Sequence, residues 1–122
     1  MIKWSPAIPG DKAVRVFISY ARKDAVDVAR QLYDHLERAG LEPWSDTPRI
    51  AGGAVWTTEI ERAIDGCDVA IALLSPASYE SDICRAEQLR ALRKGKRVIP
   101  VLIRPGTDVP LHLESNNYRV LI

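Results

Sequence analysis

Residues 13–24 read "AVRVFISYARKD" and change character within a few positions. The first half, Val14 to Ile18, is an apolar run interrupted only by Arg15. Such a run predicts a strand that is buried on both faces, which is typical of a parallel sheet covered by helices. The second half, from Ser19, is polar and begins where the strand ends. We therefore expect the first strand of an α/β domain, with a polar edge at its carboxyl end.

Strand-like and helix-like segments alternate along the rest of the chain. Apolar residues recur at helical spacing in three segments. The first follows Asp24, a plausible N-cap, and ends at Gly40, and the second runs from Trp56 to Gly66. The third runs from Asp82, with Ser81 as its cap, to Lys94. Further strands are predicted at 41–44, where Pro43 favours a sheet edge, at 67–75, at 97–103 and, shorter, at 118–122, while 75–81 is expected to be a loop. This alternation predicts a flavodoxin-like, doubly wound, five-stranded parallel sheet with helices on both faces.

The chain of 122 residues is long enough for one domain. Residues 1–12 contain two Pro and a Gly without a sustained period, so we expect an N-terminal arm or linker followed by one domain over 13–122. No helix is predicted after the last strand, which leaves one sheet face short of cover. This hints at a domain cut from a longer multidomain chain.

Composition excludes several classes of function. Lys and Arg number 17 against 16 Asp and Glu, a net charge of +1, so the basic surface of a nucleic-acid binder is not expected. No apolar run approaches the ~20 residues of a membrane helix, and no signal peptide is apparent, so we expect a cytoplasmic protein without membrane contact. Cys67 and Cys84 lack a nearby Cys or His partner, which predicts buried, reduced thiols and no metal site.

Three polar segments are expected to meet at the carboxyl edge of the sheet, where doubly wound folds bind ligands: 19–24, 44–56 and 75–87. They contain neither G-x-G-x-x-G nor G-x-x-x-x-G-K-[ST], so no dinucleotide fingerprint or P-loop is present. A phosphorylated receiver domain would need acidic residues where this chain has Ser19 and Tyr20.

The segments "RVFISYARKD", "LEPWSD", "RIAGGAVWTTEIERAI", "CDVAIALLSPASYESDICRAE" and "KRVIPVLI" follow one another in the chain. Together they resemble the successive conserved boxes of Toll/interleukin-1 receptor (TIR) domains, particularly the bacterial type, over about residues 13–122. The resemblance implies the same flavodoxin-like sheet. It also implies one of two functions, because some TIR domains cleave NAD+ and others are scaffolds that signal by self-association.

The resemblance places the catalytic glutamate of the enzymes at Glu87, in "ICRAE", which is similar to their W-C-x-x-E pattern. Ile83 departs from the Trp of that pattern. One carboxylate can suffice, since nicotinamide leaves as a neutral molecule and the enzyme mainly has to stabilise an oxocarbenium-like transition state. Without the resemblance, residue type and position favour a solvated helix residue near Arg90.

The resemblance also implies a set of ligand-binding positions. Arg22 and Arg49 correspond to basic residues of the nucleotide pocket, where guanidinium groups suit a diphosphate. Ser19 either contacts the ligand or caps a turn, and Trp56 is either a ring platform or a core residue. The full set is Ser19, Arg22, Asp46, Arg49, Trp56 and Ile83.

The segment Arg49 to Trp56 is similar to the protruding TIR loop that mediates contacts between domains. A flexible loop that simply leads into a helix would have the same sequence features. The expected function is thus an NAD+ hydrolase that cleaves the nicotinamide glycosidic bond, is activated by self-association and serves bacterial immunity or anti-phage defence. NAD+ is its substrate, and no cofactor is permanently bound. The alternatives are a non-catalytic TIR interaction module and a related glutamate-dependent enzyme acting on nucleosides.

Overall fold

The computed structural model describes residues 13–45, 53–116 and 119–120, and the side chains of residues 53–57 and 119 are outside that description. The elements, in chain order, are β1 (Arg15–Ser19), α1 (Arg22–Arg38), β2 (Glu42–Trp44), α2 (Gly53–Gly66), β3 (Val69–Leu74), α3 (Pro76–Glu80), α4 (Asp82–Arg93), β4 (Arg97–Leu102), a 3-10 turn η1 (Leu111–Leu113) and β5 (Arg119–Val120).

The strands form one parallel sheet in the order β2-β1-β3-β4-β5. The chain leaves β1 toward one side to make β2 and then crosses to the other side to make β3, so strand order reverses next to β1. The predicted edge position of β2, with Pro43, is confirmed. The doubly wound α/β class is confirmed as well; four strands carry the sheet, and β5 is limited to two residues beside β4.

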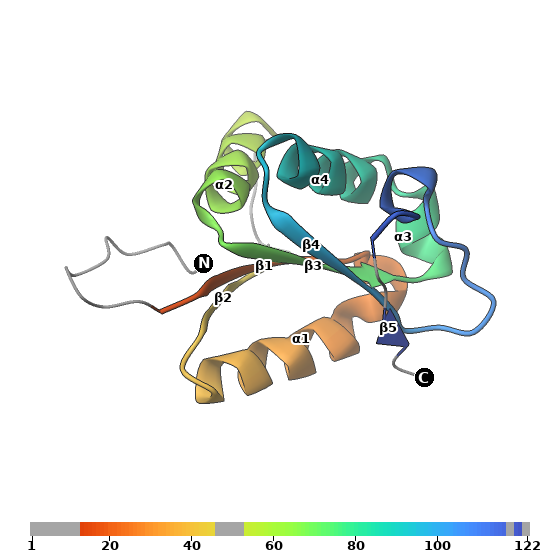
Figure 1. Cartoon of the computed structure of the whole chain (residues 1–122), viewed down its shortest axis with the longest axis horizontal. Helices are drawn as coiled ribbons and strands as arrows, with labels where there is room; N and C mark the ends of the chain where they lie inside the picture. The colour runs from red at the N-terminus through yellow and green to blue at the C-terminus, as the bar shows by residue number, and fades with distance from the viewer. Residues whose placement is uncertain (1–12, 46–52, 117–118, 121–122) are drawn as a thin grey trace.

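Helices cover the sheet on both faces, with α1 on one side and α2 and α4 on the other (Figure 1). The α2/α4 side holds the larger core, in which Phe17 stacks on Trp44 with ring centroids 5.3 Å apart. The α1 side holds a smaller core that includes Ile18 and Ala25. Phe17 and Ile18 are neighbours in β1 and point to opposite faces, which explains why the strand is apolar throughout.

Asp24 is not the N-cap of the first helix. The helix begins two residues earlier, at Arg22, after Ala21. The carboxylate of Asp24 instead accepts a hydrogen bond from Ser75 Oγ at 2.7 Å and another from the backbone N–H of Ala77 at 3.2 Å. A cap rule considers only neighbours in sequence, so it could not foresee partners that lie some fifty residues away in the chain.

The segment 75–81, expected to be a loop, contains the short helix α3. Ser75 accepts a bond from the Ser78 N–H at 3.2 Å, and the Ser78 hydroxyl lies 2.9 Å from the Ser75 N–H, forming a reciprocal cap. Five residues are too few to show a helical period, which is why the sequence pattern missed this element.

The start of α4 and the ends of α1 and α4 confirm their sequence signals, whereas α2 begins at Gly53, before the expected Trp56. The Ser81 side chain accepts a bond from the Cys84 N–H at 3.1 Å at the start of α4, as predicted. Gly40 and Gly95 follow α1 and α4 with φ of +87° and +74°, a conformation that favours glycine. No helix in the described part of the chain is long and apolar enough to cross a membrane.

Candidate active site

Ser19 and Glu87 meet in the interior. Ser19 is the last residue of β1 and points to the same face as Phe17, toward α4, because side chains alternate along a strand. Its hydroxyl donates a hydrogen bond of 2.8 Å to Oε1 of Glu87. The two residues are only 2% and 7% exposed. The sequence left Ser19 as a ligand contact or a turn cap; in the structure its hydroxyl bonds to Glu87, and a ligand contact stays a prediction.

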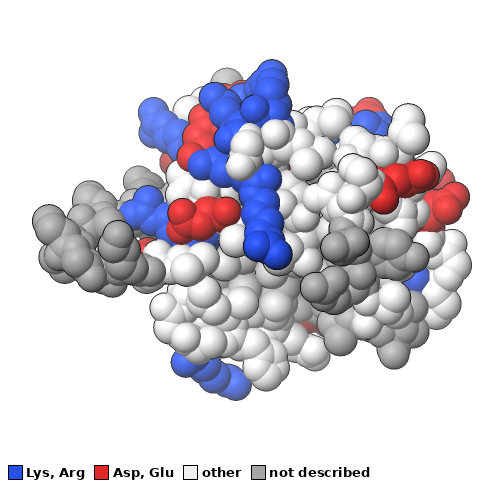
Figure 2. Space-filling model, viewed as in Figure 1, with Lys and Arg blue, Asp and Glu red and all other residues white. Residues whose placement is uncertain are grey.

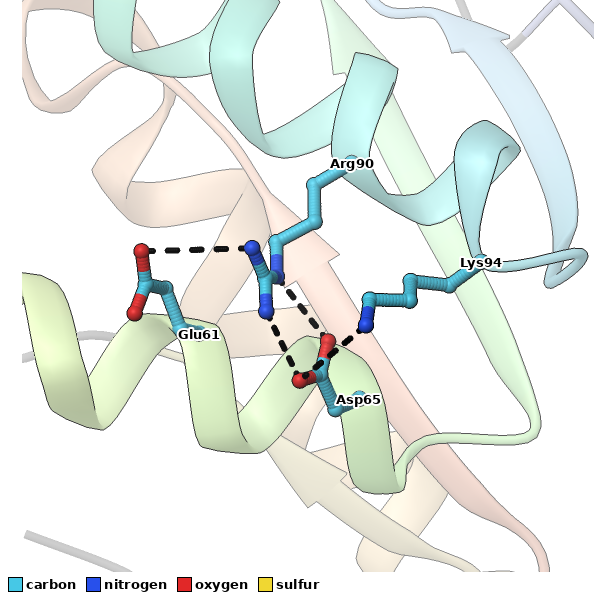
Figure 3. A network of polar contacts seen from close by, with 4 residues as sticks. All are labelled: Glu61, Asp65, Arg90 and Lys94. Carbon is cyan, nitrogen blue, oxygen red and sulfur yellow. Dashed lines mark hydrogen bonds and ion pairs between the residues drawn. The ribbon is translucent and has the colours of Figure 1, made fainter.

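Glu87 is therefore not a solvated helix residue, and its supposed neighbour Arg90 has other partners. The guanidinium of Arg90 reaches across to Asp65 of α2, with Nε at 2.9 Å from one carboxylate oxygen and Nη2 at 2.8 Å from the other (Figure 3). A carboxylate withdrawn from water is costly unless other groups compensate it, so a buried Glu in this position calls for an explanation beyond packing.

A pocket of about 290 Å³ opens beside Glu87 at the carboxyl edge of the sheet. It is formed by the start of α1, by α3 and by the start of α4. Its lining residues are Tyr20, Ala21, Arg22, Lys23, Ala77, Glu80, Ser81, Ile83, Cys84 and Glu87. Three predicted site residues, Arg22, Ile83 and Glu87, thus share one pocket. Lys23 and Glu80 were missed, although both lie in the polar segments that the sequence placed at this edge.

A larger groove of about 590 Å³ runs between α2 and α4. Among the described residues that line it, five are apolar, namely Ile60, Ile64, Ile83, Ala86 and Leu89, and four are charged, namely Glu61, Glu87, Arg90 and Arg93. Ile83 and Glu87 belong to both the groove and the pocket. Glu87 therefore lies where a polar pocket and a mostly apolar groove adjoin, an arrangement suited to a ligand with one polar and one apolar part.

The network around Arg90 fixes α4 against α2. Besides the two bonds to Asp65, Nη1 of Arg90 lies 3.9 Å from Oε2 of Glu61. Nζ of Lys94 lies 3.9 Å from Oδ2 of Asp65. Hydrogen bonding from Arg90, with smaller contributions from the nearby cations, lowers the pKa of Asp65 below its usual value. Arg90 stands about one turn beyond Glu87, so the network anchors the part of α4 that carries the candidate catalytic residue.

Charges of both signs lie side by side over the α2 and α4 layer on the face drawn in Figure 2. The described part of this face thus carries a mixed surface, unlike the basic stripe typical of nucleic-acid binders. Cys67 and Cys84 are buried thiols, as predicted. Burial raises the pKa of Cys67 to about 11, so this thiol is protonated at neutral pH.

Asp46 and Arg49 lie outside the described residues, as does the 49–52 part of the predicted contact loop. Trp56 lies in α2, but its side chain is outside the description. The roles predicted for these three residues, and for the loop, remain predictions.

Residues 16–121 match the TIR domain family. This range includes almost all of the described sheet and its helices. The chain belongs to the TIR domain family. A probable 2' cyclic ADP-D-ribose synthase from Brachypodium distachyon, BdTIR, is 34% identical over 100 residues, or 80% of this chain. The match spans 45% of that relative, so this TIR domain corresponds to about half of its length.

Solved structures agree on the fold. The TIR domain of the Toll-related receptor TRR-2 from Hydra magnipapillata superposes with a TM-score of 0.70 at 30% identity, covering 86% of this chain and 82% of that one. The Clostridium botulinum CMP N-glycosidase BcmB superposes with a TM-score of 0.66 at 24% identity, covering 88% of each chain. At that identity, the second likeness shows the fold alone.

Proposed function

We propose that this TIR domain cleaves NAD+ at the nicotinamide glycosidic bond, with Glu87 as the catalytic carboxylate. The observation that carries the proposal is the burial of Glu87 at the junction of the pocket and the groove, with its carboxylate bonded to Ser19. The similarity to a protein named as a cyclic ADP-ribose synthase supports the choice of substrate, because ADP-ribose is what remains of NAD+ once nicotinamide has left.

The chemistry fits a single carboxylate. The ribose C1'–N bond breaks, its electron pair goes to the positively charged pyridinium ring, and nicotinamide leaves neutral. The anion of Glu87 then stabilises the positive charge that develops on the ribose. Addition of water to C1' and loss of one proton gives ADP-ribose; attack by a hydroxyl of the same molecule gives a cyclic product instead. Arg22 and Lys23, at the mouth of the pocket, are suited to the diphosphate.

A non-catalytic TIR interaction module is the second candidate. Two observations favour it: Ile83 stands where the enzymatic pattern has Trp, and the Hydra structure of similar fold is a receptor domain at 30% identity. A nucleoside-processing enzyme is a third candidate. Its support is limited to the fold that this chain shares with the CMP N-glycosidase.

The test is a chromatographic assay of the purified chain with NAD+ and, separately, with CMP. We expect nicotinamide release from NAD+ by the parent and a fall of at least a hundredfold in Glu87→Gln, which keeps the size of the side chain and removes its charge. Circular dichroism must show that the variant is folded. Base release from CMP alone would favour the nucleoside-processing enzyme, and no turnover of either substrate, even at high protein concentration, would favour the interaction module.

We further propose that the domain acts in the cytoplasm, in bacterial immunity or anti-phage defence, and is switched on by self-association through Arg49 to Trp56. The resemblance of the sequence to bacterial TIR domains supports this setting.

A further inference from the structure

Ser19 and Glu87 lie 68 positions apart in sequence, and their contact is among the most deeply buried polar contacts of the described residues. Ser19 ends a central strand that pairs with β3 over four residues, Ser19 facing Ala72. Glu87 lies in the middle of α4. The bond of 2.8 Å therefore joins a rigid strand to the helix that borders both the pocket and the groove.

A serine at this position is unexpected on packing grounds. The residue two positions earlier on the same face is Phe17, stacked on Trp44, and the register neighbour is Ala72, so an alanine would suit the surroundings. A buried hydroxyl destabilises the fold unless it is hydrogen-bonded. Glu87 is the partner that the structure provides, and the same bond helps to compensate the burial of the carboxylate.

We propose that Ser19 is a positioning residue for Glu87. This inference rests on the proposed catalytic role of Glu87. A glutamate side chain has three rotatable bonds, and a donor held on a strand restricts the rotation of its carboxylate. The hydroxyl also donates to the carboxylate and thereby favours the ionised form, which is the form that stabilises positive charge on the ribose. Ser19 itself does not touch the reacting atoms.

Other charges near Glu87 come from every helix that packs around it. Among the described residues, the other charged side chains that line the pocket and the groove are Arg22 and Lys23 of α1, Glu80 of α3, Glu61 of α2, and Arg90 and Arg93 of α4. A substitution at Ser19 leaves all of them in place. The difference between parent and variant therefore reports on the hydroxyl, whatever the combined effect of these charges.

Kinetics provide the first test, with Ser19→Ala, Ser19→Thr and the control Ser78→Ala. Ser78 is also buried, but its hydroxyl bonds within the α3 cap and it lines neither the pocket nor the groove. We expect Ser19→Ala to lower kcat for NAD+ about tenfold with KM within about twofold, the cost of one bond to a charged group. Ser19→Thr restores most of kcat, and Ser78→Ala keeps it. Parental kcat in Ser19→Ala would overturn the proposal.

A second readout does not depend on turnover. The carboxyl carbon of Glu87, labelled with 13C and assigned by its loss in Glu87→Gln, is titrated by NMR in parent and variants. Loss of the donor disfavours the charged form, so the midpoint in Ser19→Ala rises by about one pH unit, while Ser78→Ala leaves it in place. An unmoved midpoint overturns the inference. A parent chain that leaves NAD+ intact overturns the proposed function alone, because the titration still decides whether Ser19 controls the carboxylate.

Discussion

At the scale of single residues, Ile83 is the position at which a substitution can test how the pocket holds a flat ring. It is 44% exposed, belongs to both the pocket and the groove, and precedes Glu87 by about one turn of α4. An aliphatic side chain there offers apolar contact area but no ring face on which a flat base can stack. The exposure also means that a larger side chain at this position does not have to displace the core.

We therefore expect Ile83→Trp to tighten NAD+ binding by about 1 kcal/mol, roughly fivefold in Kd, because an aromatic ring adds stacking to burial. Binding is measured by calorimetry in the Glu87→Gln background, where the ligand is not consumed. The matched control is Leu89→Trp, which adds the same ring to the groove, at a residue that is 45% exposed and outside the pocket. Equal affinity of the Ile83→Trp variant and its parent would show that no ring stacks at this position.

At the scale of elements, the contact between α2 and α4 combines an apolar layer with the ion network of Figure 3. Ile60, Ile64 and Ala91 are buried in the layer, whereas Asp65 and Arg90 lie at its margin. The apolar layer supplies most of the free energy that holds α2 against α4, because each partly exposed ion pair contributes little. The network instead fixes how α4 lies against α2.

Asp65→Asn tests the network through pH. The pKa of Asp65 is lowered in the folded chain from its usual 3.8, so its stabilisation is present above that value and is lost as pH falls through the lower folded pKa. At pH 7 we expect the variant to lose about 1 kcal/mol or less of unfolding free energy, discounted for exposure, and the gap from the parent closes as the pH falls below 3.8. Urea unfolding at pH 7 and at a series of lower pH values measures the loss and the closing of the gap. The exposed Asp27→Asn serves as control, and a gap that is constant with pH would contradict the ion-pair explanation.

At the scale of the whole molecule, the proposed activity calls for regulation, because an enzyme that always degraded NAD+ would be harmful to its own cell. The proposed contact segment, Arg49 to Trp56, includes the first residues of α2, from Gly53, and α2 forms one wall of the groove beside Glu87. Head-to-tail contacts through such a loop would extend into open assemblies unless the rotation closes a ring. Assembly would then act on the groove through α2.

We expect specific activity to rise steeply with the concentration of the chain. The sharper form of the test mixes a trace of parent with a large excess of Glu87→Gln, which assembles but does not turn over substrate. If assembly activates the domain, the inactive chain raises the turnover of each parent molecule, and light scattering follows the assembly in parallel. A rate strictly proportional to the parent concentration, with or without the inactive chain, would exclude activation by assembly.

The sequence by itself determined the main strands and helices and their order, but not the short helix α3. Strands at Arg15–Ser19, Val69–Leu74 and Arg97–Leu102 and the helix after Ser81 were predictable because local burial patterns and caps depend on neighbours in the chain. The match of five ordered motifs likewise identified the family and, with it, Glu87 as the candidate catalytic residue. Burial patterns, caps and the order of the motifs can all be read along the chain, so no three-dimensional information was needed for these predictions.

Only the tertiary structure decided what those residues do to one another. From its neighbours in the chain alone, Glu87 could be an exposed helix residue near Arg90, yet it is buried and bonded to Ser19, while Arg90 binds Asp65 of another helix. Asp24 read as a cap and in fact binds Ser75. Each of these pairs joins residues at least 25 positions apart, and the preferences of neighbouring residues carry no record of a partner brought in by the crossing of the chain.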